Sequence, residues 1–213
     1  MKKNIVSLML LLGLALPLLA QNKVEERVKL ARERYAQGLE TIATVKMYEE
    51  DDIPALNYTT VVRKENFAGS GMTVDKMEFY YNAIEDEMEP QPIGYKIMMV
   101  RRTYNVAETQ YFEEYVYDED CKPLFWFTRF GYHDETDYDY TVELRGYFDA
   151  NGTLVRNICK KAGSDGKLKT CSIEDRVNES HEENFEYHFT KARKYFQNLR
   201  TIFDALYEMK YEY

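Results

Sequence analysis

The chain has 213 residues, which is enough for one domain with a hydrophobic core of its own. It carries 28 basic and 37 acidic residues, a formal net charge of −9, so its surface repels phosphate backbones and anionic lipid. Nucleic acid is therefore excluded as an expected partner. The 19 tyrosines indicate either a β-rich core built of aromatic side chains or an aromatic binding surface.

Residues 1–20 have the layout of a secretory signal peptide. Lys2 and Lys3 form a positive end, residues 5–19 are mostly apolar, and Ala20 is a small residue at which a signal peptidase can cut. The apolar run is too short and wrongly flanked for a membrane-spanning helix. Because Gln21 follows the cut instead of Cys, we expect no lipid anchor. The pattern predicts export to the periplasm or beyond, with 21–213 as one mature domain of net charge −11 once the two lysines are removed.

The segment 22–46 is predicted to be a helix. Its apolar residues recur at alternating steps of four and three, and charged residues fill the other positions, so one stripe faces a core. The stripe consists of Val24, Val28, Ala31, Tyr35, Gly38, Ile42 and Val45. Four consecutive acidic residues, 49–52, and then Pro54 end the pattern.

The middle of the chain changes its period from 3.6 to 2, which is typical of strands. Strand-like runs cover 56–66, 73–81, 93–104, 110–117, 124–130, 138–148, 154–160 and 167–173. Turn signals separate several of them, the clearest being Asn151-Gly152 and Asp165-Gly166. No gap has room for a crossover helix, so the runs predict an antiparallel meander of seven or eight strands.

The aromatic strands suggest where a ligand could bind. Residues 124–127 are apolar on both faces, whereas a strand with one wet face alternates. Either both faces of the sheet are covered, or one face is an open aromatic platform. In the second case we expect the ligand-binding residues to be Tyr111, Tyr115, Trp126 and Phe130.

The segment 180–209 is predicted to be a second helix. Phenylalanine and other apolar residues repeat along it at four-three spacing, from Phe185 to Leu206. Ser180 and Glu183 form a possible capping box at its start. The stripe favours packing onto the sheet, with a coiled-coil seam as the alternative.

Three cysteines enter an oxidising compartment, so one pair and one leftover thiol are expected. Counting outward from the turn at 164–166 sets Cys159 opposite Cys171, which predicts a disulfide, with two unbonded cysteines as the alternative. Cys121 lies in an acidic turn where glycine would be expected. We interpret it as an idle thiol, because neighbouring carboxylates raise a thiol pKa.

Catalytic and metal-binding signals are weak. The three histidines form no i,i+4 ligand pair, no Cys-x-x-Cys occurs, and the acidic loop around Asp134, Asp137 and Asp139 lacks an EF-hand pattern. Glu113 and Glu114 are adjacent on one strand and so point to opposite faces. Glu113 with Glu78 or Glu143 across the sheet would be needed for a glycosidase-like carboxylate pair. We expect no catalytic residue, no metal and no cofactor.

Two strand–turn–strand units are alike: 115–124 and 146–154 each read aromatic-Asp, tight turn, then Leu and a second strand. They resemble the MORN-like aromatic hairpins of exported bacterial proteins. The whole layout is similar to exported single-domain proteins of gut Gram-negative anaerobes, a resemblance that implies no catalytic residues.

Taken together, the sequence predicts an α+β fold with a meander sheet, an N-terminal helix alongside and a C-terminal helix packed on it. The favoured function is an exported non-catalytic binding protein that meets a glycan or peptide on the aromatic face. One alternative is a helix-grip or lipoprotein-carrier-like fold that encloses an apolar small molecule in a cavity lined by Met98, Phe125 and Phe127. Another is an acidic module that docks on, or inhibits, a protein. The sequence leaves the oligomeric state open.

Overall fold

A computed structural model describes residues 2–51, 57–68, 71–107, 109–133, 139–163, 165–176 and 183–208. Side chains are described from Gln21 onward, except those of Phe67, Tyr132, His133, Asp139 and Glu208. The expected acidic loop at 134–139 and the capping box at Ser180 lie mainly outside these residues.

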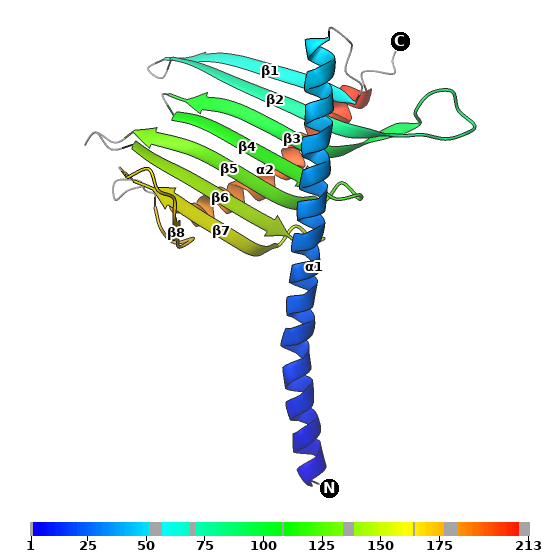
Figure 1. Ribbon diagram of the computed structural model, residues 1–213, viewed down its shortest axis with the longest axis vertical. Helices are drawn as coiled ribbons and strands as arrows, with labels where there is room; N and C mark the ends of the chain where they lie inside the picture. Colours follow the sequence, from blue (N-terminus) through cyan, green and yellow to red (C-terminus); the bar gives the residue numbers. More distant parts are fainter. Residues whose placement is uncertain are drawn as a thin grey trace.

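Eight strands form one antiparallel sheet in which spatial order follows chain order (Figure 1). The predicted α+β meander is therefore confirmed. Its strands are β1 (Tyr58–Phe67), β2 (Gly71–Ile84), β3 (Gly94–Val106), β4 (Thr109–Tyr117), β5 (Pro123–His133), β6 (Asp139–Phe148), β7 (Leu154–Ala162) and β8 (Lys169–Cys171). Each predicted run overlaps one of these strands.

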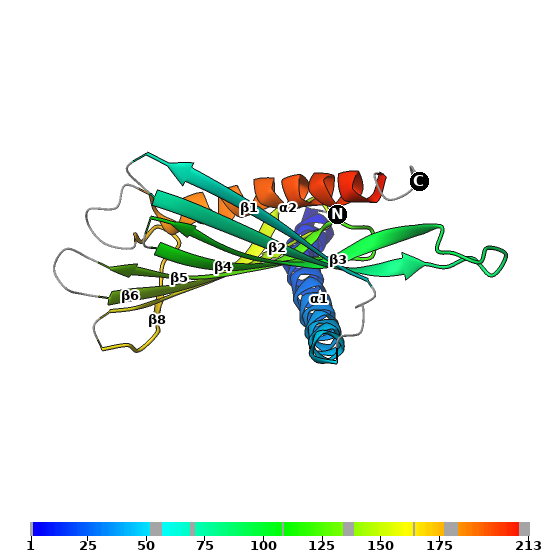
Figure 2. The ribbon, with the colours of Figure 1, turned by 90° about the horizontal axis from the view of Figure 1, so that it is seen from above.

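Helix α2 (Phe185–Glu208) covers one face of the sheet (Figure 2). Its apolar stripe is buried, which confirms packing onto the sheet. Phe196 contacts the rings of Tyr115, Tyr117 and Phe148, with centroids 5.1, 5.1 and 5.4 Å away. Helix α2 begins later than predicted, because Asn184 caps it: the Tyr187 backbone N–H donates to Asn184 Oδ1 at 3.2 Å.

Helix α1 (Lys2–Glu50) lies on the opposite face and runs across the strands (Figures 1 and 2). It extends the predicted helix in both directions, and it contacts β2 to β6. Val28, Ala31, Ile42 and Val45 are buried against the sheet, as the stripe predicted. A Cβ on Gly38 would stand 2.6 Å from Met99 Sδ, so this glycine allows the close approach. Among the residues whose side chains are described, no helix is long and apolar enough to span a membrane.

The two similar strand–turn–strand units fold into the same turn. In the first, Asp118 Oδ1 accepts hydrogen bonds from the N–H groups of Asp120 and Lys122, at 3.0 and 2.9 Å. In the second, Asp149 Oδ1 accepts from the residues at the same offsets, two and four positions on, at 2.8 and 2.9 Å. Cys121 stands at φ 58° where the second unit has Gly152 at φ 74°. The cysteine thus occupies a left-handed position that glycine adopts without strain.

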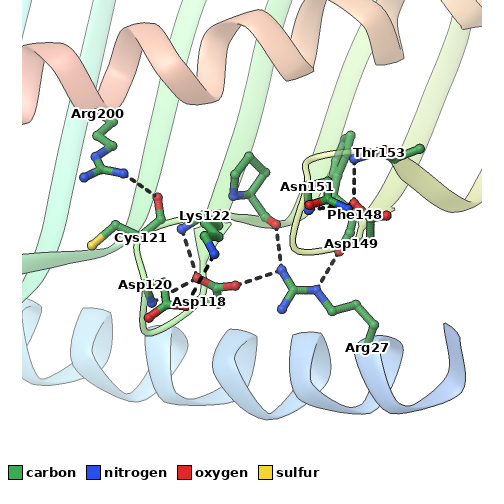
Figure 3. A network of polar contacts seen from close by, with 11 residues as sticks. Arg27, Asp118, Asp120, Cys121, Lys122, Phe148, Asp149, Asn151, Thr153 and Arg200 are labelled. Carbon is green, nitrogen blue, oxygen red and sulfur yellow. Dashed lines mark hydrogen bonds and ion pairs between the residues drawn. The ribbon is translucent and has the colours of Figure 1, made fainter. Parts of the chain in front are cut away.

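Arg27 of α1 joins these two turns (Figure 3). Its Nη2 donates to Asp118 Oδ2 and to the Pro123 carbonyl, both at 2.9 Å, and its Nε donates to the Phe148 carbonyl at 2.7 Å. One guanidinium therefore satisfies acceptors from the β4–β5 and β6–β7 connections together.

Cys159 and Cys171 are partners across the β7–β8 ladder, so the predicted register is confirmed. The predicted disulfide is not formed in the structure, where both are thiols. The Cys159 thiol is directed at a neighbour on its own strand, Asn157 Oδ1, at 4.0 Å. Burial raises its pKa to about 11, so the reactive thiolate is disfavoured there.

Replacing Arg27 should loosen both turns. Arg27→Gln removes a charged donor from an Asp carboxylate and two carbonyls, so we expect the free energy of unfolding to fall by about 2–3 kcal/mol. Arg27→Lys should recover only part of this loss, because a single ammonium group cannot reproduce the planar set of N–H donors of a guanidinium.

Urea unfolding of the two variants measures the effect. Arg32→Gln, on the exposed side of α1, is the control and should change stability by less than about 0.5 kcal/mol. Equal losses of stability in Arg27→Gln and Arg32→Gln would contradict the conclusion that Arg27 holds the two turns together.

Candidate functional site

The predicted aromatic platform is not open. Trp126, Tyr115 and Phe130 are 1%, 0% and 3% exposed, and Tyr111 is half-buried. Helix α2 covers this part of the sheet, and its Phe189 ring meets the Trp126 ring edge-on at 5.4 Å. The expectation of an open ligand-binding surface does not fit Tyr115, Trp126 and Phe130, because helix α2 covers them, whereas Tyr111 keeps part of its surface exposed.

Two of the four aromatic residues belong to a stack that crosses three strands and ends on α2. Tyr111 stacks on Tyr104 at 4.8 Å and on Phe130 at 5.1 Å, and Phe130 stacks on His188 at 5.2 Å. These rings pack against one another at the edge of the α2 interface. They therefore contribute to packing and leave little ring surface for a ligand.

The opposite face offers no open aromatic patch at Phe127 either. The guanidinium groups of Arg129 and Arg145 lie over its ring at 5.9 and 5.3 Å, and both pair with Glu143. Met98, Phe125 and Phe127, expected to line a carrier cavity, pack in the core cluster beneath α1.

Three charged side chains are buried between α2 and strands β2 to β4. Arg102 makes a bidentate pair with Asp75, each contact 2.9 Å, and its Nη1 lies 3.4 Å from Glu113 Oε2. Their exposed fractions are 7%, 3% and 5%. Buried charges that lack partners are very costly, and here each carboxylate is paired with Arg102.

Two tyrosines complete this cluster. The hydroxyl of Tyr115 donates to Glu113 Oε2 at 2.7 Å, and that of Tyr104 donates to Oε1 at 3.2 Å. Burial raises the pKa of Glu113, although Arg102 and the two hydroxyls oppose the shift. Burial also raises the pKa values of Tyr104 and Tyr115, and the Glu113 charge adds to both shifts. The tyrosines are therefore neutral donors at physiological pH.

A groove of about 590 Å³ opens beside this cluster, between β1 and one flank of α2. Asp75 and Arg102 lie at its floor with Met77, while Arg63 forms part of the β1 side, 3.6 Å from Asp75. The α2 side is formed by Tyr195, Asn198, Leu199 and Ile202. The groove thus combines an apolar wall with a few charged and amide groups, the usual make-up of a ligand site.

The strand beside the groove is an edge strand. No described strand pairs with the outer side of β1. The Tyr81 N–H donates to the Asn57 carbonyl, and the register pairs Tyr58 with Tyr80 without interruption along β1. Because antiparallel pairs alternate, odd-numbered residues bond to β2 and even-numbered ones point outward. The backbone N–H and C=O groups of Thr60, Val62 and Lys64 therefore face away from the sheet.

The sequence prediction missed Asp75 and Arg102, although a signal was present. Asp75 shares its strand face with Met77 and Phe79, and Arg102 lies between Val100 and Tyr104 on the same face. A charge at an inward position of an apolar strand face signals a buried partner. The strand register identifies the partner. Asp75 lies opposite Tyr104 of β3, and Arg102 is the next residue along the same face of that strand.

The carboxylate pair considered for glycosidase chemistry does not form. Glu113 faces α2, whereas Glu114 accepts a hydrogen bond from Tyr35 of α1 at 2.7 Å, so the two adjacent residues point to opposite faces as predicted. Glu143 pairs with Arg129 and Arg145 on the α1 side and cannot meet Glu113. The described residues contain no cluster of metal-ligating side chains.

No protein-family model matches this chain, and neither a curated protein nor a solved structure is similar enough to count as a match. Function must therefore be inferred from the residues themselves.

The buried carboxylate gives a pH prediction. A pKa raised by folding favours the protonated acid, so the contribution of Glu113 to stability is greatest below its ordinary pKa of 4.5. It declines as the pH rises toward the folded-state value. Relative to Glu113→Gln, the wild type should therefore lose stability as the pH is raised from about 4.

Parallel urea titrations of wild type and Glu113→Gln between pH 4 and 8 measure this difference, and other titrating groups cancel in the comparison. A stability difference that is constant with pH, or that grows in favour of wild type, would contradict the raised pKa.

Proposed function

We propose that this is an exported, non-catalytic binding protein that holds an extended peptide along β1. The observation that carries the proposal is that the edge strand β1 lies beside the groove. The outward backbone groups of β1 and the side chains that line the groove are therefore within reach of one extended peptide. The peptide adds a strand to the sheet, and its alternate side chains reach toward the groove.

The backbone of β1 supports strand addition. The strand has ten residues, contains no proline and pairs with β2 without a bulge. The outward groups of Thr60, Val62 and Lys64 are spaced two residues apart, which matches the hydrogen-bonding period of an extended chain. These main-chain bonds supply affinity for a peptide of any sequence.

The groove supplies selectivity. Val61, Leu199 and Ile202 favour an apolar side chain, while Asn198 and Tyr195 offer hydrogen-bonding groups. The Asp75–Arg102 pair is already satisfied within the protein, so a ligand in the groove needs to bring no charge to balance it. We therefore favour peptides that alternate polar residues with branched apolar ones.

Export fits this function. The signal-like residues 1–20 would carry the domain to a compartment where peptides and unfolded segments of other proteins are encountered. The acidic surface disfavours nucleic acid as a ligand, and the proposal needs no cofactor and no catalytic group.

Substitutions at Val62 separate the backbone contact from the side chain. Val62→Pro removes an N–H that points away from the sheet, so edge proline should leave the fold intact while blocking peptide addition. Affinity for a panel of short synthetic peptides with alternating branched apolar residues should fall at least about tenfold. Val62→Ala keeps the N–H and is the matched control.

Fluorescence anisotropy of labelled peptides measures affinity, and hydrogen exchange locates the contact. Bound peptide should slow exchange at Thr60, Val62 and Lys64, and leave Val61 and Arg63, already bonded within the sheet, unchanged. Equal binding by the proline and alanine variants, or no change at the β1 edge, would contradict strand addition.

A further inference from the structure

A second groove lies along the other flank of α2, and we propose that it binds a small anion carrying at least two negative charges. It has a volume of about 600 Å³ and opens between α2 and the two Asp-centred turns. None of its residues lines the groove beside β1, so the two sites are independent.

The charge of the lining residues points to an anion. Lys122, Arg193, Lys194 and Arg200 all border the groove, and none of the described residues that line it carries a carboxylate. Arg200 pairs with Asp204 at 3.6 Å and Lys122 with Asp120 at 3.6 Å. Within the described part of the chain, Arg193 and Lys194 make no ion pair, which leaves two uncompensated positive charges in a protein that is acidic overall.

Three of these cations, Arg193, Lys194 and Arg200, belong to α2, and Lys122 belongs to the facing turn. Thr190, Arg193, Gln197 and Arg200 recur at steps of three and four, so their side chains follow one line along α2. The buried stripe of Phe189 and Phe196 runs next to that line and holds the helix against the sheet. The spacing between Arg193 and Arg200 is therefore fixed when α2 packs on the sheet.

The opposite wall is rigid. Asp118 and Asp149 cap their own turns, and Arg27 ties the two turns together from α1 (Figure 3). Arg200 Nη1 reaches across the groove to the Cys121 carbonyl, at 3.4 Å, so helix and turn are connected at one end. A wall fixed by hydrogen bonds loses little entropy on binding, which favours a defined ligand over loose counter-ions.

The composition also limits the ligand. A hollow of this size suits a small molecule, and Asn151, Gln197 and Thr190 add neutral hydrogen-bonding groups to the cations. Carboxylate and phosphate both satisfy this chemistry, as Arg forms paired hydrogen bonds with either. We therefore infer a multiply charged carboxylate or phosphate ligand.

Isothermal titration calorimetry with citrate and with pyrophosphate, at low ionic strength, tests the site on the protein beginning at Gln21. We expect one equivalent of at least one probe to bind and the affinity to weaken with added salt. Binding of citrate alone would indicate a carboxylate ligand, and binding of pyrophosphate alone would indicate a phosphate ligand. Binding of both would assign the shared dianion chemistry.

The double substitution Arg193→Gln with Lys194→Gln should weaken binding at least tenfold. The control, Lys23→Gln with Lys46→Gln on the exposed side of α1, removes the same charge and should leave affinity unchanged. Thermal unfolding checks that both variants are folded. Failure of both probes to bind, or equal weakening by the two double variants, would overturn the proposal, because net charge alone would then explain any effect.

Discussion

The packing of the α2 phenylalanine stripe on the centre of the sheet is the interaction on which the other features depend. Helix α2 crosses the strands, and its rings contact β2, β4, β5 and β6. An α-helix with its side chains is about 10–12 Å across, whereas a strand of ten residues is about 33 Å long, so α2 covers only part of the length of each strand. Helix α2 buries Trp126 and Tyr115 beneath it and leaves an uncovered strip along each flank. Both proposed binding sites lie in these strips, one toward β1 and one toward the turns.

The other face is organised by α1, which crosses the strands near the end where the two Asp-centred turns lie. Arg27 joins those turns, and Tyr35 reaches the buried Glu114. The charged groups on both faces are thus mostly satisfied by neighbours on the sheet or on a helix. Against this background of internal pairing, the two proposals assign partners to Arg193 and Lys194, which make no ion pair within the described part of the chain, and to the outward backbone of β1.

The strands were predictable because period-2 patterns and turn residues are local signals. The Asn151-Gly152 turn and the likeness of the two units around Asp118 and Asp149 both correspond to real geometry. The candidate binding sites were not predictable, because residues 124–127 are apolar on both faces and this pattern fits either a covered sheet or an open aromatic platform. The number of strands one helix spans, and the pairing of Asp75 with Arg102 from separate strands, depend on tertiary packing. The pairing of Cys159 with Cys171 across the strands was predictable by counting residues outward from the turn at 164–166. That pairing alone does not decide whether a disulfide forms.

The central claim, that α2 seals the aromatic face of the sheet, can be tested through Trp126, because it is the single tryptophan in the chain. Its fluorescence reports directly on the interface with Phe189. The account predicts blue-shifted emission and poor quenching by acrylamide in the free protein, both lost when the protein unfolds. Red-shifted emission with efficient quenching in the folded protein would show that the Trp126 indole is exposed to solvent. That result would contradict the seating of α2 and both grooves that follow from it.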